Sequence, residues 1–249
     1  MEPGLAEILL LGPESEDLDQ VAWHQVQLAT TRVEAVISRG GPAAGGKPNE
    51  DAALVLAEAE PLLVMVADAH FGASASVLAV DSVARIYRGT AWGEVGEDGL
   101  RDVLLRMVRV SQGAILERGE GSETTLLAGL YRQGVLHWAN VGDSYLYRLP
   151  PRGGASVINT PAPVWLGARI RVPVHELTEI GRCRVEAGTR VLLATDGIPE
   201  PRRGILAFGP SRIRALLDVP GERPLERLAR AALEEAGEDN IAGVLLTGG

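Results

Sequence analysis

Short apolar runs alternate with polar turns over most of the chain. These runs are rich in Val, Leu, Ile and aromatic residues and end at Gly, Pro or charged residues, which is typical of β-strands. Two of them, Leu62–Ala67 and residues 190–195, are almost continuously apolar, so we expect both faces of these strands to be buried. The sequence predicts strands over Ala52–Leu56, Leu62–Ala67, residues 124–131 and 134–140, Tyr145–Leu149, residues 190–195 and Ile241–Thr247.

Helical periodicity marks three further segments. Apolar residues recur every three or four positions over residues 77–87, 100–115 and 225–233, and Pro224 stands at the first turn of the last one. The neighbouring strands at 124–131 and 134–140 are joined by too few residues for a crossover helix, so they pair antiparallel. This order of elements predicts an α+β fold and argues against a doubly wound parallel sheet.

Composition and charge narrow the class of protein. Hydrophobic residues make up 46% and charged residues 23% of the 249 residues, which is ordinary for a globular protein. A net charge of −9 makes nucleic acid an unsuitable partner and favours metal cations. The single cysteine, Cys183, cannot form an internal disulfide. No apolar run approaches the roughly 20 residues that cross a bilayer.

These observations predict the organisation of the protein. We expect a cytoplasmic monomer with no membrane segment and no nucleic-acid partner. We also expect one domain over residues 1–249, in which residues 1–20 form a loosely attached N-terminal segment.

Acidic residues stand at the ends of four predicted strands. Asp68 and Asp196 each follow an apolar strand, and Asp51 and Asp239 each precede one. Asx residues are common at such positions simply as turn formers. A rigid strand end also fixes a carboxylate well, and several carboxylates at one rim form an oxygen-rich site that suits Mg²⁺ or Mn²⁺. The four acids with their particular neighbours favour the metal site.

Six short motifs occur in the order in which they occur in the metal-dependent PPM/PP2C protein phosphatases, and the sequence resembles that family. The family patterns are N-E-D, D-G-H-G-G, G-T-T, V-G-D-S, L-L-x-S-D-G and a terminal D-N. The matching segments are Asn49-Glu50-Asp51-Ala52, Asp68-Ala69-His70-Phe71-Gly72, Glu123-Thr124-Thr125-Leu126, Val141-Gly142-Asp143-Ser144, Leu192-Leu193-Ala194-Thr195-Asp196-Gly197-Ile198 and Glu238-Asp239-Asn240-Ile241.

The resemblance implies a PP2C-like four-layer αββα sandwich, in which two antiparallel sheets are flanked by helices and a two-metal site lies at one end. Asp68 would bridge two Mn²⁺ or Mg²⁺ ions, and the backbone carbonyl of Ala69 would bind one of them. Asp196 and Asp239 would complete the shell of the other ion, and Asp51 would bind or orient metal-bound waters. Ala69 replaces a family Gly and would be strained at a positive φ.

The resemblance also implies the activity, a phosphoserine/phosphothreonine protein phosphatase in signalling. A metal-bound hydroxide would attack the phosphoryl group, so no covalent phosphoenzyme is required. His70 stands two residues after Asp68 and would protonate the departing alkoxide, although a merely structural hydrogen-bonded His is the alternative. Asp143 matches a family Asp of a third, weaker metal site. We expect the other histidines, His24, His137 and His175, to be structural.

The sequence departs from the family at the substrate side of the site. Five positions before Asp51, where the family carries an Arg that grips the substrate phosphate, this chain has Gly46. Lys47 stands beside it and could contact phosphate as a point charge, or could be an exposed loop lysine. Arg39, at the other end of the loop, is the competing candidate. Residues 160–171, which include Trp165, would form a reduced flap.

Two other hypotheses fit parts of the sequence. The segment from Gly41 to Lys47 fits the G-x-x-x-x-G-K pattern of a P-loop, but Pro48 stands where Ser or Thr should bind Mg²⁺. The second hypothesis is a catalytically weak PPM-fold protein that binds a phosphorylated partner or regulates another protein. The missing Arg favours this second hypothesis, and the complete set of acids opposes it.

Overall fold

The computed structural model describes residues 6–58, 60–169 and 171–249. The helices are α1 (Ser74–Arg88), α2 (Glu97–Arg118), α3 (Pro210–Asp218) and α4 (Pro224–Glu235). The strands are β1 (Glu7–Leu11), β2 (Ala22–Gln27), β3 (Arg32–Ser38), β4 (Ala52–Leu56), β5 (Leu62–Ala67), β6 (Ala69–His70), β7 (Glu123–Thr124), β8 (Leu126–Arg132), β9 (Val135–Val141), β10 (Tyr145–Leu149), β11 (Ser156–Val157), β12 (Glu179–Arg184), β13 (Arg190–Ala194) and β14 (Ile241–Thr247).

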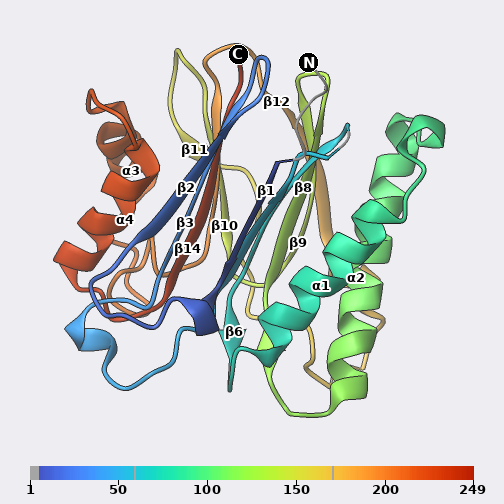
Figure 1. Ribbon diagram of the computed structural model, residues 1–249, viewed down its shortest axis with the longest axis horizontal. Coiled ribbons are helices and arrows are strands. Elements are labelled where there is room, and N and C mark those ends of the chain that lie inside the picture. The colour runs from blue at the N-terminus through green and yellow to red at the C-terminus, as the bar shows by residue number, and fades with distance from the viewer. Residues whose placement is uncertain (1–5, 59, 170) are drawn as a thin grey trace.

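Two six-stranded antiparallel sheets pack face to face, and helices cover both outer faces (Figure 1). The first sheet has the order β1-β4-β5-β8-β9-β12 and is covered by α1 and α2. The second sheet has the order β11-β10-β13-β14-β3-β2 and is covered by α3 and α4. The predicted αββα sandwich of an α+β fold is therefore confirmed.

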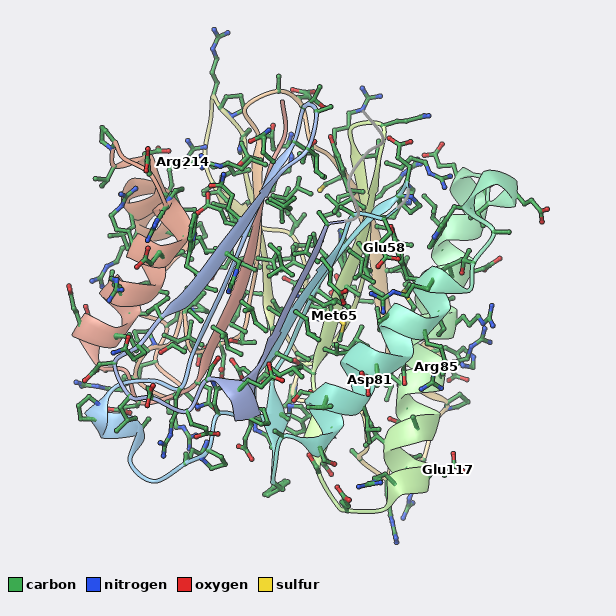
Figure 2. All side chains as sticks on the ribbon, in the orientation of Figure 1. Glu58, Met65, Asp81, Arg85, Glu117 and Arg214 are labelled. Atoms are coloured by element: carbon green, nitrogen blue, oxygen red, sulfur yellow. The ribbon has the colours of Figure 1, made fainter. Side chains whose placement is uncertain are left out.

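The continuously apolar strands are explained by the layering. In β5, Leu63 and Met65 face α1 and α2, whereas Val64 and Val66 face the second sheet. Met65, labelled in Figure 2, is fully buried in this outer layer. Because successive side chains of a strand point to opposite faces, a strand buried on both faces must be apolar at every position. This requirement fixed the predicted bounds of β4 and β5, which agree with the structure.

One predicted strand is divided in the structure. Residues 124–131 form β7 and β8, which are separated at Thr125. The division has a local cause, since the backbone N–H of Thr125 donates to the carbonyl oxygen of Asp68 at 2.8 Å instead of to a partner strand. β7 pairs with the short β6 as a separate two-stranded ladder, which lies at the lower end of the sandwich in Figure 1.

The beginning of the chain requires a correction. We predicted a loosely attached segment over residues 1–20, but β1 pairs antiparallel with β4 over five residue pairs from Glu7↔Leu56 to Leu11↔Ala52. Ile8 and Leu10 are buried between the two sheets. β1 is therefore an integral edge strand of the first sheet, and residues 1–5 lie outside the described residues.

The P-loop hypothesis is wrong. A P-loop opens a helix, whereas the segment after Lys47 leads through Asp51 directly into β4. In the described ranges, no helix has the length and apolar character that crossing a membrane requires.

Candidate metal centre and substrate cavity

The pairing of four strands brings the predicted acids to one end of the sandwich. β4 and β5 are antiparallel with Ala52 opposite Ala67, so Asp51 before β4 and Asp68 after β5 lie at the same end of the first sheet. β13 and β14 are paired in the same way, with Ala194 opposite Gly243. The end of β13 and the start of β14 therefore meet at the corresponding end of the second sheet.

Hydrogen bonds across the two sheets lock this end together. The hydroxyl of Thr195 donates to Oδ2 of Asp51 at 2.8 Å, and the side-chain oxygen of Asn240 accepts from the backbone N–H of Glu50 at 2.9 Å. Gly197 allows the close approach, because a Cβ at this position would lie 1.8 Å from the carbonyl oxygen of Asn240. These contacts explain the D-G and D-N motifs, which serve packing as well as chemistry.

Asp68 is held through its backbone. Its N–H donates to the hydroxyl oxygen of Thr125 at 2.9 Å, and its carbonyl oxygen accepts from the hydroxyl of Thr124 at 3.0 Å. The hydroxyl groups of Thr125 and Ser144 lie 2.9 Å apart. The paired threonines and the turn after β9 therefore fix the position of the Asp68 carboxylate while leaving its own oxygens directed to the neighbouring acids.

Three acids form the deep part of the site: Asp51, Asp68 and Asp196. Burial raises the pKa of the Asp51 and Asp68 carboxyls well above the usual range, and the neighbouring acids raise both pKa values further. Burial also raises the pKa of Asp196, as do the charges of Asp68 and Asp239. Carboxylates that raise one another's pKa in this way are typical of sites that bind cations.

Asp143 lies close enough to this group for its charge to raise the pKa of Asp68 and Asp196. Burial raises the pKa of Asp143 itself. Among the described residues, neither its Oδ1 nor Oδ1 of Asp51 has a hydrogen-bond partner, although both atoms are buried. Buried carboxylate oxygen atoms of this kind are suited to bind a divalent cation.

His70 faces the acids from β6. Its Nδ1 lies 4.0 Å from Oδ1 of Asp68, and its ring stacks edge-on against Trp165 with ring centroids 5.4 Å apart. Ala69 is buried in β6 and does not adopt a positive φ, so the strain that we expected at Ala69 is absent. Phe71 carries the left-handed conformation instead, with φ of 64° and 78% of the residue exposed.

The rim of the site has a different charge arrangement. Arg203 donates from Nε and Nη2 to the two oxygens of Asp239 at 2.7 and 3.0 Å. Nζ of Lys47 lies 3.5 Å from Oδ1 of the same carboxylate. Arg39 is engaged elsewhere, since its Nε donates to the carbonyl oxygen of Lys47 at 2.7 Å and its Nη1 to that of Glu16 at 2.8 Å. Arg39 therefore supports the loop rather than facing the site.

A cavity of about 410 Å³ opens over these groups. It combines acids, cations, a histidine and an exposed aromatic ring, a lining that suits a charged ligand. The cavity is lined by Lys47, Glu50, His70, Phe71, Asp196, Arg203, Gly204 and Asp239.

The donor set fits divalent cations by its chemistry. In the described part of the chain, no three or more His, Cys, Asp or Glu side chains stand as a group already arranged to hold a metal ion. Both oxygens of Asp239 contact cationic side chains, those of Arg203 and Lys47. The buried, unpartnered oxygen atoms of Asp51 and Asp143 and the raised pKa values of the deep acids nevertheless suit an oxygen-rich cation site.

Two residues of the site escaped the sequence analysis as functional residues. Arg203 follows the D-G motif in a loop whose course the sequence does not predict. Trp165 was placed only in a reduced flap, and the structure shows that its neighbour Leu166 pairs with Thr124 through two backbone hydrogen bonds of 2.9 and 2.8 Å. The backbone next to Trp165 therefore lies against β7, and this places the indole ring beside His70 and Asp143.

No protein-family model and no curated protein matches this sequence. Solved structures do match it, and the fold of the chain is the fold of the bacterial PP2C-type serine/threonine phosphatases.

Three of these structures illustrate the likeness. The serine/threonine phosphatase PstP/Ppp of Mycobacterium tuberculosis is 22% identical with a TM-score of 0.66, and the match covers 88% of this chain and 98% of that chain. PppA, described as a regulatory component of T6SS in Pseudomonas aeruginosa, is 23% identical with a TM-score of 0.66 and coverage of 91% and 100%. The S. agalactiae serine/threonine phosphatase is 17% identical with a TM-score of 0.71 and coverage of 92% and 100%. The PstP catalytic domain is also known in complex with two manganese ions.

Proposed function

We propose that this protein is a Mn²⁺- or Mg²⁺-dependent phosphatase that hydrolyses phosphoserine or phosphothreonine in protein substrates. The observation that carries the proposal is the gathering of Asp51, Asp68 and Asp196 at one end of a PP2C-type sandwich, each with a pKa raised by burial and by its acidic neighbours. Such a cluster is costly to the fold unless it serves to bind cations.

The residues that would hold the metal ions are those that the resemblance implies. Asp68 and the carbonyl group of Ala69 would bind metal at the centre of the site. Asp196 and Asp239 would bind metal on one side, and Asp51 would contact metal through water. Asp143 would serve a third ion. When bound, two divalent ions would supply an activated water and positive charge next to the phosphoryl oxygens.

His70 and Lys47 would act on the substrate. The ring of His70 lies between the deep acids and the cavity, packed against Trp165, so it is oriented to give a proton to the departing serine or threonine oxygen. Lys47 lines the same cavity and would contact the phosphate. Nothing in this scheme needs a protein nucleophile, and burial raises the pKa of the Cys183 thiol to about 11, which keeps that group protonated.

The test is metal-dependent hydrolysis by the purified protein. We expect turnover of p-nitrophenyl phosphate and of a phosphothreonine peptide with Mn²⁺, and loss of both activities in excess EDTA. Undiminished activity in EDTA would contradict the metal mechanism. Tight binding of the phosphopeptide without hydrolysis would instead favour a catalytically weak phosphoprotein-binding protein, for which the missing Arg at Gly46 is the supporting observation. The cytoplasmic, monomeric, one-domain organisation stays a prediction.

A further inference from the structure

Arg203 belongs to the loop between β13 and α3, and a tight turn presents it to the cavity. The backbone N–H of Ile205 donates to the carbonyl oxygen of Arg202 at 2.9 Å, and Gly204 takes φ of 69° within this turn. Both Arg203 and Gly204 line the cavity that His70 and Asp196 also line. The turn therefore holds one guanidinium group at the rim of the proposed active site.

The cations that line this cavity differ in geometry. Lys47 offers a point charge, whereas the guanidinium of Arg203 is a planar fork that already binds a carboxylate through two hydrogen bonds, at 2.7 and 3.0 Å to Asp239. About half of the Arg203 side chain, 49%, remains exposed. A fork that fits the two oxygens of a carboxylate fits two oxygens of a phosphate equally well.

The alternatives for a forked phosphate contact are weaker. Gly46 has no side chain, and the guanidinium of Arg39 is bound to the carbonyl oxygens of Lys47 and Glu16. A phosphate dianion that approaches this end of the sandwich also meets several carboxylates, so it requires cations at the rim. Arg203 is the cavity-lining arginine in the described part of the chain.

We propose that Arg203 binds the phosphate group of the substrate, in partnership with Lys47, and supplies the bidentate contact that the chain lacks at Gly46. This inference rests on the proposed phosphatase function. Asp239 is a predicted metal ligand, and its two oxygens cannot fully satisfy both a divalent ion and the guanidinium. Arg203 is therefore paired with Asp239 before an anion arrives, and its guanidinium binds an anion that enters the cavity.

The experiment compares Arg203→Ala and Arg203→Lys with the neighbouring control Arg202→Ala. Arg202 carries the same charge on the same turn, but it ion-pairs with Glu238 at 3.7 Å and is 61% exposed. Calorimetry measures the Kd of inorganic phosphate on the Mn²⁺-loaded protein and, separately, the Kd of Mn²⁺ alone. Steady-state kinetics on p-nitrophenyl phosphate give KM and kcat for each variant.

We expect Arg203→Ala to weaken phosphate binding about 10- to 100-fold and to raise KM in parallel, the loss typical of two hydrogen bonds to a charged group. Arg203→Lys should recover part of the loss, Arg202→Ala should stay within about twofold of the wild type, and Mn²⁺ affinity in Arg203→Ala should be unchanged or tighter.

Two outcomes overturn the inference. If Arg203→Ala binds phosphate like the wild type while its melting temperature or Mn²⁺ affinity changes, Arg203 only neutralises Asp239. If Arg202→Ala loses as much phosphate affinity as Arg203→Ala, the loss comes from the lower positive charge of the turn and not from a specific contact of Arg203. Should Arg203→Ala fail to fold, Arg203→Gln against Arg202→Gln gives the same comparison. A wild-type protein that neither binds inorganic phosphate nor hydrolyses p-nitrophenyl phosphate refutes the proposed function itself, which is a different result from a defect of the Arg203 variants.

Discussion

The deep part of the site and its rim differ in how positive charge balances their carboxylates. Asp51 and Asp68 are buried, Asp196 is half-buried beside them, and burial together with mutual repulsion raises the pKa of each carboxyl. At the rim, Asp239 binds Arg203 through two hydrogen bonds and lies 3.5 Å from Lys47. The two regions belong to the same end of the sandwich and to the same cavity.

This difference indicates which kind of ligand each region suits. Uncompensated carboxylates in the deep part favour cations, because only added positive charge relieves their repulsion. Cations at the rim favour a negatively charged group, and they lie in the same cavity as His70, the proposed proton donor. Together the two regions are suited to a phosphate that bridges bound metal ions and basic side chains.

The largest expected effect comes from removing one deep charge. Asp68→Asn should reduce activity by about 1,000-fold or more, since it removes the central metal ligand. The same change should raise the free energy of unfolding of the metal-free protein by about 1–3 kcal/mol, because a buried repulsive charge is lost. Kinetics and thermal unfolding measure the two effects, and Asp81→Asn on the exposed face of α1 is the control (Figure 2). A destabilised Asp68→Asn protein would show that the deep acids are not in repulsion.

His70 lies between the two regions, and its replacement should affect the hydrolysis of two substrate types differently. His70→Ala should slow hydrolysis of a phosphothreonine peptide about 100-fold, because an alkoxide leaving group needs a proton. Hydrolysis of p-nitrophenyl phosphate, whose phenolate leaves readily, should fall much less. Equal losses in kcat on both substrates would remove His70 from the role of acid.

The pH dependence of stability tests the deep part without any mutation. The folded-state pKa values of Asp51, Asp68 and Asp196 are raised, so the folded chain binds more protons than the unfolded chain above about pH 4. Stability of the metal-free protein should therefore be highest in acid and fall as the pH rises toward neutrality.

Mn²⁺ should reverse this loss. At a concentration 100 times its Kd, Mn²⁺ should raise the free energy of unfolding by about 2.7 kcal/mol at neutral pH. Thermal melts at several pH values, with EDTA and with Mn²⁺, measure both effects. A metal-free protein that becomes more stable from pH 5 to pH 8 would contradict the assignment, and an equal gain from Mn²⁺ in Asp68→Asn would place the ion elsewhere.

At the rim, Lys47→Ala should raise KM about five- to thirtyfold, which corresponds to about 1–2 kcal/mol for one contact to a charged group. Metal affinity should be unchanged and Lys47→Arg should remain active. Initial rates over a range of substrate concentrations measure the effect. A change in kcat alone would mean that Lys47 acts on the transition state rather than on substrate binding.

The smallest effect concerns Phe71. This residue holds a left-handed backbone conformation that suits Gly, and 78% of it is exposed, so little packing is lost on its removal. Phe71→Gly should raise the free energy of unfolding by about 0.5–1 kcal/mol. Chemical denaturation measures the change. Weaker binding of a phosphopeptide by this variant, with p-nitrophenyl phosphate unaffected, would add a role for the ring in peptide selection.

The sequence alone was sufficient to predict most of the buried strands and the positions of the acids, although it did not predict the buried strand β3. β4, β5, β10 and β14 have the predicted bounds, and α4 begins at the predicted Pro224. In β4, β5 and β14, burial on both faces leaves almost only apolar residues, and the acids that follow or precede these strands stand out for that reason. The motifs therefore indicated the fold, and the structure brings Asp51, Asp68 and Asp196 together at one end of the sandwich.

The edges of the sheets and the rim of the site depend on tertiary contacts that the local sequence does not reveal. β2 and β12 are polar, partly exposed strands whose pairing depends on β3 and β9, so their own sequences carry little β signal. Arg203 and Trp165 lie in loops far along the chain from Lys47 and His70. Loop side chains meet through the packing of distant segments, and no periodicity within a loop records which partner it will reach.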